Sequence, residues 1–353
     1  MKITKLASGW IETETTPTYH GWPTLCRTSD GRLLAAVSGG RERHICPFGR
    51  VYLYESTDGG LTWSAPRILS KGPLDDRDCG IVEAGDGSLL INYFTSVAFT
   101  RESNMPETWK GPMNSITLDT LRREHGFWMI RSTDGGKTWS EKYAVPVNNV
   151  HGPTLLNDGS LLWIGRERGH YIDQSCMGLR VKVYHSTDNG LTWKAIAAMP
   201  ELAGQSQRHW HEVDTVQMAD GRLITQIRNE NHKTCIADIG TWQAESFDMG
   251  ITWSPYHKVS PSFPSDLLRL ADGRILMTAG SRQKPYGVHV LVGPEIPVRH
   301  WSDETILTDD DETIDCGYPS SVQLDDGTLV TLWYSYRSKT GVAQLRWLKW
   351  KLD

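Results

Sequence analysis

The chain has 353 residues, of which 39% are hydrophobic and 22% charged, and its formal net charge is −5 at pH 7. This composition excludes disordered and collagen-like chains, and no apolar run approaches the about 20 residues that a membrane helix needs. The acidic balance gives no general attraction to phosphate, so nucleic acid and membranes are not expected partners. The first residues lack the apolar segment of an intact signal peptide, so a cytoplasmic protein, or an exported one with its signal removed, is expected.

The first repeating feature is a pair of apolar segments joined by an Asp-Gly turn. It occurs six times, at residues 24–37, 80–94, 153–165, 214–227, 266–280 and 320–334. Asp-Gly between apolar segments is a strong hairpin signal, because the turn needs a residue that accepts a positive φ. The turn glycines lie 52 to 72 residues apart: Gly31, Gly87, Gly159, Gly221, Gly273 and Gly327. This spacing leaves room for a second hairpin after each first one, which predicts six four-stranded units.

A second motif, Ser-x-Asp-x-Gly-x-Thr-Trp, lies between these hairpins. It occurs at 56–63, 132–139, 186–193 and 246–253, each time after a short β-type run. The Asp accepts backbone N–H groups within a tight turn, the Gly takes the strained φ, and the Trp packs under the hairpin. In the fifth unit only the closing Trp301 remains.

Through these motifs, known as Asp boxes or BNR repeats, the chain resembles the sialidase (neuraminidase) superfamily. The resemblance covers essentially all 353 residues. It implies one all-β domain, 1–353, built as a six-bladed β-propeller with four antiparallel strands per blade. The segment KITKLASGWIE is expected to add an outer strand to the last blade. Extra sequence at 97–126, in blade two, is expected to be partly helical, as either a wall of the binding face or a surface insertion.

The resemblance also implies a chemistry. Sialidases are exo-acting glycoside hydrolases in which a tyrosine attacks the sugar, because the sugar's own carboxylate would repel a carboxylate nucleophile. A glutamate takes the phenolic proton, an aspartic acid protonates the leaving oxygen, and three arginines bind the substrate carboxylate. At the matching positions, the resemblance implies Tyr318 as nucleophile, Glu212 as its base, and Arg228 and Arg282 as two of the arginines.

Two parts of the sialidase pattern are missing. Sialidases open blade one with Arg-Ile-Pro, whereas Gly21, Trp22 and Pro23 stand here, so the first arginine is absent. The acid aspartate usually lies in the loop before the first Asp box. The loop at 39–50 has no aspartate, and its only acidic residue is Glu42. Blade two offers a substitute in the sequence Asp-Asp-Arg-Asp at 75–78. We expect Asp78, or second to it Asp76, to be the acid, with Arg77 beside it.

Other polar residues are expected on the same face, because residues near the start of each blade's first strand converge at the centre of a propeller. The further substrate-binding candidates are Arg77, Arg41, His44, His151, His209, His211 and Trp22. Each key residue also has a structural interpretation. Glu212 could be an ion pair for Arg228, Tyr318 could be a packing ring with a satisfied hydroxyl, and Trp22 could pack between blades.

Three functions are consistent with the sequence. The first is a retaining hydrolase that removes a terminal acidic sugar, sialic acid or a relative, from a glycan. The second is a propeller glycosidase acting on a uronic or neutral terminal sugar of a polysaccharide, which the missing arginine favours. The third is a carbohydrate-binding propeller without activity. No cofactor is expected, and no metal, because the His-Trp-His run at 209–211 lacks a third ligand at a diagnostic spacing.

Overall fold

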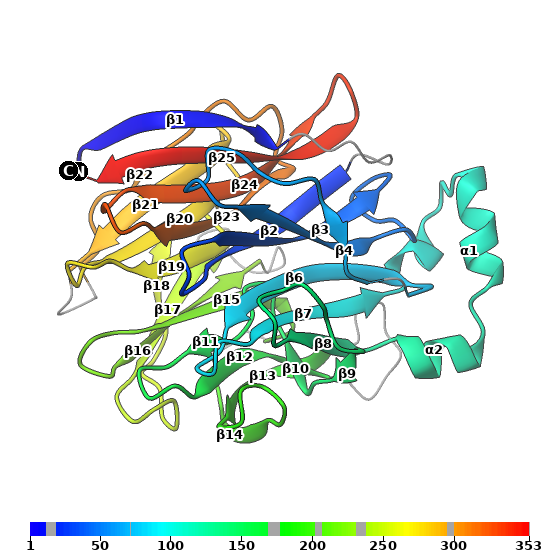
Figure 1. Cartoon of the computed structure of the whole chain (residues 1–353), viewed down its shortest axis with the longest axis horizontal. Coiled ribbons are helices and arrows are strands. Elements are labelled where there is room, and N and C mark those ends of the chain that lie inside the picture. The colour runs from blue at the N-terminus through cyan, green and yellow to red at the C-terminus, as the bar shows by residue number, and fades with distance from the viewer. Residues whose placement is uncertain are drawn as a thin grey trace.

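The computed structural model describes residues 1–11, 19–70, 72–168, 177–201, 207–230, 238–294 and 300–352. The chain is all-β, with short antiparallel strands connected in sequence order and arranged as in a propeller (Figure 1). The innermost strands contact one another in a closed cycle, from β2 through β6, β11, β15, β19 and β23 back to β2. None of the described helices has the length and hydropathy needed to cross a membrane.

Three sheets contain four strands and one contains five. The first comprises β6 (Asp75–Glu83), β7 (Leu89–Ser96), β8 (Phe127–Ser132) and β9 (Tyr143–Ala144). The five-stranded sheet comprises β10 (Val147–Asn148), β11 (Thr154–Leu155), β12 (Leu161–Arg168), β13 (Met177–Ser186) and β14 (Lys194–Ala198). The next two comprise β15 (Trp210–Gln217), β16 (Leu223–Asn229), β17 (Gly240–Ser246) and β18 (His257–Ser260), then β19 (Ser265–Arg269), β20 (Ile275–Ser281), β21 (Gly287–Gly293) and β22 (Thr305–Ile306).

The fifth sheet has eight strands and joins the two ends of the chain. One half comprises β23 (Cys316–Gln323), β24 (Leu329–Arg337), β25 (Val342–Leu352) and β1 (Ile3–Ile11), and the other β2 (Tyr19–Arg27), β3 (Leu33–Arg41), β4 (Arg50–Ser56) and β5 (Arg67–Ile68). The halves meet at one parallel pair, Tyr19 with Ala343. Hydrogen bonding thus gives five sheets, so the expected six separate blades are confirmed only in part. The expected outer strand is confirmed, because β1 pairs with β25 (Figure 1).

Both repeated motifs form the predicted turns. All six Asp-Gly glycines have φ between 78° and 89° and connect antiparallel strand pairs. In the second Asp box, Asp134 accepts hydrogen bonds from the Thr138 backbone N–H at 2.9 Å and the Thr138 hydroxyl at 2.6 Å. The Trp139 indole N–H donates to the Gly136 carbonyl at 3.1 Å. The same indole bond recurs in the other three boxes, through Trp63, Trp193 and Trp253.

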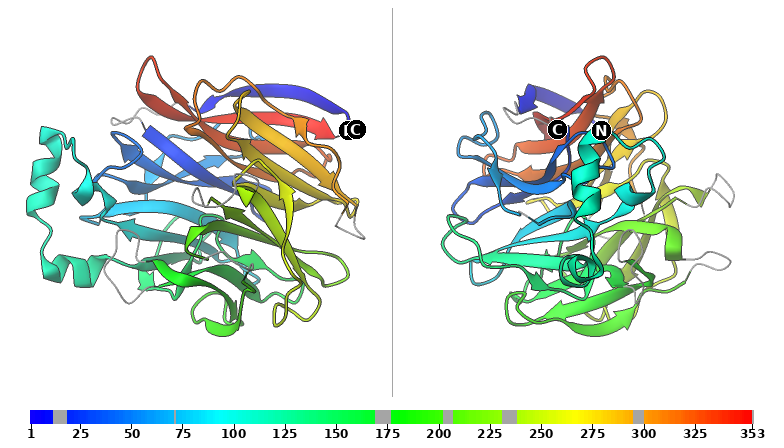
Figure 2. Two further views of the ribbon diagram at one scale, coloured as in Figure 1. Left: turned by 180° about the vertical axis from the view of Figure 1, so that it is seen from behind. Right: turned by 90° about the vertical axis from the view of Figure 1, so that its right-hand side faces the viewer.

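The insertion at 97–126 is partly helical, as expected. It contains η1 (Ala98–Arg101), η2 (Glu107–Trp109), α1 (Lys110–Asn114) and α2 (Leu118–Glu124), and it projects away from the chain termini (Figure 2). Its anchor is Trp109, which is fully buried and donates to the Glu42 carboxylate at 2.7 Å. Arg43 lies 4.4 Å from the Trp109 ring centre. The insertion therefore holds the loop between β3 and β4, and Glu42 has a structural role there.

Candidate active site

Four of the innermost strands carry the same irregularity at their upstream ends. The strand register shifts at this point in β2, β6, β15 and β23, leaving extra residues unpaired. The first unpaired residue has a positive φ: Trp22 (55°), Asp78 (46°), Glu212 (46°) and Tyr318 (51°). Residues other than glycine seldom adopt this left-handed backbone conformation. Bulges that redirect side chains are frequent beside active sites. The repeated bulge brings these four residues together.

Tyr318, Glu212 and Arg228 form the centre of the site. The Tyr318 hydroxyl donates to Glu212 Oε1 at 2.5 Å. Arg228 Nη1 donates to both carboxylate oxygens of Glu212, at 2.8 and 2.7 Å, and to the Tyr318 hydroxyl oxygen at 3.0 Å. The other terminal nitrogen of Arg228 pairs with Glu230. The three residues predicted to act together are therefore in direct contact.

Burial and neighbouring charges determine the protonation states of Tyr318 and Glu212. Burial and the Glu212 carboxylate raise the pKa of the Tyr318 phenol well above its usual value. Burial would also raise the pKa of Glu212, but the Arg228 charge, together with smaller effects of His211 and of the hydrogen bonds from Tyr318 and Arg228, holds the pKa below its ordinary value. At neutral pH the proton therefore resides on Tyr318, and Glu212 is ionised and placed to accept it.

Two hollows adjoin this centre. The larger one, beside Tyr318, has a volume of about 710 Å³, enough for a sugar residue. Arg228, Arg282 and Phe263 lie on one side of it. Arg282 Nη1 donates to the carbonyls of Ile314 and Cys316, at 2.5 and 2.8 Å, which fixes its guanidinium 5.7 Å from the Tyr318 ring centre. The predicted placement of Arg282 near the nucleophile is therefore observed.

Asp315 also lines this larger hollow, and sequence reasoning missed it. Its carboxylate accepts hydrogen bonds from the hydroxyls of Tyr19 at 2.8 Å and Tyr334 at 2.7 Å, and lies 3.2 Å from His44 Nδ1. Burial would raise the pKa of Asp315, but the His44 and tyrosine hydrogen bonds lower it. Asp315 directly precedes β23, so convergence at strand starts was the signal that could have found it.

Asp78 lies in a separate, smaller hollow of about 60 Å³, which it lines together with His211 and Glu212. Burial raises the pKa of Asp78 above its ordinary value, against the lowering effect of Arg77, whose Nε is 3.9 Å from Asp78 Oδ1. Burial also lowers the pKa of His211 to about 4. Since Glu212 lines the smaller hollow and Tyr318 the larger, their hydrogen bond lies between the two. The smaller hollow has room for a few waters and not for a sugar ring.

Trp22 lies beneath the site. Its side chain is 1% exposed, with the guanidinium carbons of Arg41 and Arg77 at 5.2 and 4.7 Å from its ring centre. Arg41 is itself fully buried and forms two hydrogen bonds with Asp75, at 2.5 and 2.9 Å. The expected substrate contacts of Trp22 and Arg41 are therefore corrected to packing and ion pairing below the binding surface.

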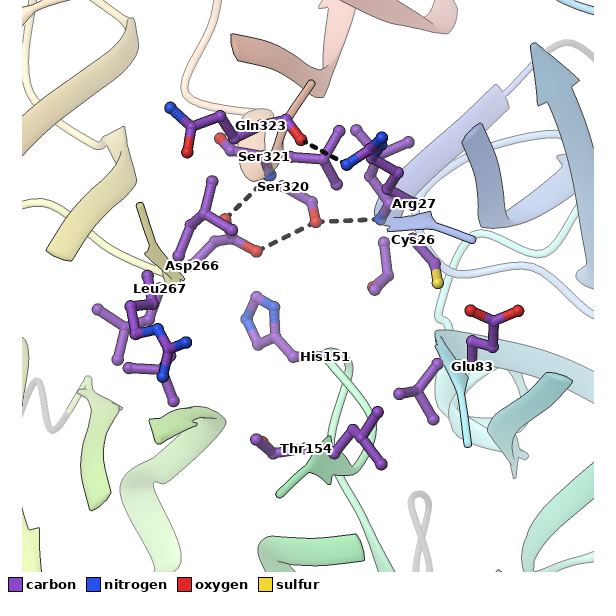
Figure 3. A pocket seen from close by; sticks show the side chains of 18 of the residues that line it. Cys26, Arg27, Glu83, His151, Thr154, Asp266, Leu267, Ser320, Ser321 and Gln323 are labelled. Carbon is purple, nitrogen blue, oxygen red and sulfur yellow. Dashed lines mark hydrogen bonds between the residues drawn. The ribbon is translucent and has the colours of Figure 1, made fainter. Parts of the chain in front are cut away.

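Three other expected positions are corrected. Asp76 is buried beside Ser70 and Arg50, and burial raises its pKa to about 7. His209 ends η3 (Gln207–His209) and lines neither hollow, whereas His151 faces a different cavity (Figure 3). For Asp76 the physical reason is strand alternation on β6, where neighbouring residues point to opposite faces. His209 and His151 lie outside strands, in η3 and in the loop before β11, so the strand pattern does not place their side chains.

Comparisons with known proteins agree with this architecture. Residues 31–331 match the family of BNR repeat-like domains. A sialidase from Paraclostridium sordellii is 23% identical over 256 residues, covering 67% of this chain and 58% of that protein, so the chain spans little more than half of its length.

Two solved structures share the fold. A protein of unknown function from Dyadobacter fermentans aligns over 99% of both chains, with a TM-score of 0.79 and 20% identity. The NanB sialidase of Streptococcus pneumoniae aligns over 99% of this chain and 70% of its own, with a TM-score of 0.69 and 15% identity. The repeats, the fold and these matches together establish that the chain belongs to the family of BNR repeat-like domains, within the sialidase superfamily.

Proposed function

We propose that this protein is an exo-acting, retaining glycoside hydrolase that removes a terminal acidic sugar, sialic acid or a relative, from a glycan. The observation that carries the proposal is the 2.5 Å hydrogen bond from Tyr318 to Glu212. Glu212 takes the phenolic proton as the Tyr318 oxygen bonds to the anomeric carbon and the glycosidic bond breaks. Water then gives a proton to the acid group and attacks from the face that the leaving group vacated, while Tyr318 leaves and regains its proton from Glu212. The two inversions together retain the anomeric configuration.

The leaving oxygen needs a proton, and Asp78 is our first candidate for its source, acting through a water in the smaller hollow because that hollow does not admit the sugar. Its raised pKa keeps it protonated to a higher pH than an ordinary aspartic acid. A second candidate is His44, which lines the larger hollow in the loop where sialidases carry their acid. Asp315 would orient its ring through the 3.2 Å contact.

The carboxylate of an acidic sugar would bind to Arg282 and Arg228, since planar guanidinium groups suit bidentate contacts. Gly21 holds the missing first position, and it lies beside the rings of Tyr19 and Tyr334. Asp315, which accepts hydrogen bonds from the hydroxyls of both tyrosines, places a carboxylate there instead. That observation favours a second candidate function, hydrolysis of a uronic or neutral sugar whose hydroxyls bind Asp315.

Release of a fluorophore from an aryl α-sialoside, beside a panel of aryl uronides and neutral glycosides, tests the proposal. We expect sialoside turnover with retained configuration, and a loss of at least about 100-fold in Tyr318→Phe. Tyr334→Phe, which removes a neighbouring hydroxyl, is the matched control and should lose much less. Turnover of another glycoside alone would support the second function. Glycan binding without any product would refute both.

A further inference from the structure

A second cavity lies at the downstream ends of the innermost strands. Its volume is about 970 Å³, and it shares no lining residue with the two hollows of the candidate active site. Residues of all six innermost strands, β2, β6, β11, β15, β19 and β23, line it, so we call it the axial cavity. Figure 3 shows side chains converging on it from these strands.

Three potential metal ligands gather in the axial cavity. His151, Asp214 and Asp266 each offer one ligand atom, and these atoms lie within 4.8 Å of one another. His151 precedes β11, Asp214 belongs to β15, and Asp266 to β19. The three residues therefore come from three consecutive sheets, and no single turn or hairpin explains their meeting.

His151 is the most informative of the three. Its side chain points into the axial cavity (Figure 3) and is 8% exposed, yet neither ring nitrogen has a hydrogen-bond partner. Leaving a buried polar group unpaired costs about 1–3 kcal/mol, so buried imidazoles normally have partners. An imidazole with both nitrogens unpaired, facing two carboxylates, has the arrangement of a metal ligand lacking its ion.

The two carboxylates are oriented but not neutralised. Asp214 accepts the backbone N–H groups of Thr215 at 2.8 Å and Leu267 at 2.6 Å. Asp266 accepts the Ser320 hydroxyl at 3.1 Å and the Ser321 backbone N–H at 3.0 Å. All these donors are neutral, and among the described residues neither carboxylate is paired with Lys or Arg. Two adjacent carboxylates in this setting need either a counter-charge or a shared proton.

We propose that His151, Asp214 and Asp266 bind one divalent cation of the Zn²⁺ or Mn²⁺ type. Imidazole is a common ligand of Zn²⁺, and carboxylates suit Mn²⁺ and other hard ions, so a mixed set of one nitrogen and two oxygen ligands fits these borderline ions. Two carboxylates balance the charge of the ion, and the axial cavity has room for waters to complete its coordination. The ion would connect three sheets at the centre of the molecule.

Metal binding and thermal unfolding of the full chain test this proposal. Protein treated with chelator and then dialysed against ZnCl2 or MnCl2 should retain one equivalent of metal and unfold at a higher Tm than the chelated protein. His151→Ala should lose both the metal and the Tm increase. Since His151 makes no hydrogen bond, this variant leaves no partner unsatisfied and should fold. Asp214→Asn provides a second, independent loss of a ligand.

His185→Ala is the matched control, because His185 lies on β13 and its Nε2 pairs with the Ser160 hydroxyl at 2.8 Å. It should bind metal as the wild type does. Equal metal binding by wild type and His151→Ala would overturn the proposal by placing the metal elsewhere. Absence of any bound metal in the wild type would also overturn it, and would mean that the two carboxylates share a proton instead.

Discussion

Side-chain direction in this site is set by backbone strain at single residues. Asp78, Glu212 and Tyr318 all have φ near +50° at bulges in three of the six innermost strands, β6, β15 and β23. A non-glycine residue in this region costs on the order of 1–3 kcal/mol, which persists only where the surroundings enforce it. The equivalent residue of β2 is Trp22, whose indole is buried. The first strand thus contributes packing where the others contribute titratable groups, and this is the clearest departure from a sialidase site.

The role of Asp78 can be tested through the pH dependence of turnover. Its raised pKa keeps the acid protonated at higher pH, so kcat/KM should fall as the pH rises through that pKa. Asp78→Asn should abolish this alkaline limb and reduce turnover by roughly 100- to 10,000-fold for a poor leaving group. An aryl substrate with an acidic leaving group should be affected much less. A profile unchanged in Asp78→Asn but altered in His44→Gln would identify His44 as the acid.

Asp76 should govern stability instead of turnover. Burial raises its pKa to about 7, and Oδ2 has no hydrogen-bond partner. Between the unfolded pKa, near 4, and about 7, the folded state holds a proton that the unfolded state has lost. The free energy of unfolding therefore falls as the pH rises through this window. Asp76→Asn should flatten this slope, by an amount on the order of a few kcal/mol at pH 8, in urea unfolding at pH 4, 6 and 8. An unchanged slope would contradict the assignment.

Turns and loops away from the centre act by holding elements in place. The Asp boxes connect the third and fourth strands of their sheets, and the insertion at 97–126 fixes the loop that carries His44. No residue of the insertion lines the larger hollow. Of the two roles expected for it, a wall of the binding face is therefore not observed. The insertion lies at the surface and in addition supports this loop, through the contact between Trp109 and Glu42.

An Asp box should contribute to stability without affecting catalysis. Asp134→Ala removes hydrogen bonds from Ser132 and Thr138. We expect a lower free energy of unfolding, measured by urea denaturation, because the turn loses these hydrogen bonds, and unchanged kcat/KM. Asp134→Asn, which keeps one acceptor oxygen, should lose less. A large drop in kcat/KM in a variant that is fully folded would mean that the turn influences the active site.

At the scale of the whole molecule, periodic features could be predicted from the sequence and long-range ones could not. The hairpins, Asp boxes and outer strand follow from local turn chemistry and repetition. The meeting of Tyr318, Glu212 and Arg228 followed from matching positions in a known architecture. Asp315 and His151 were missed or misplaced, because their environments depend on contacts between segments more than 60 residues apart in sequence. Strand alternation and bulges decide which cavity such a side chain faces, and single-sequence patterns do not reveal bulges.

Closure of the sheet arrangement depends on the two ends of the chain, which lie together (Figure 1). β1 pairs antiparallel with β25 from Ile3 to Ile11, covering an edge that would otherwise present unpaired backbone groups. Gly9 is the sensitive position, because a Cβ there would lie 2.9 Å from the Trp347 ring.

Gly9→Val should therefore displace β1 and open the closure. We expect a Tm lower by several degrees, corresponding to about 1–3 kcal/mol for overpacking, and greater aggregation on heating. Leu6→Ala is the control on the same strand, since Leu6 is 47% exposed and its loss should change Tm little. Differential scanning calorimetry and light scattering measure both effects. Equal Tm values for the two variants would mean that β1 packs without closing the fold.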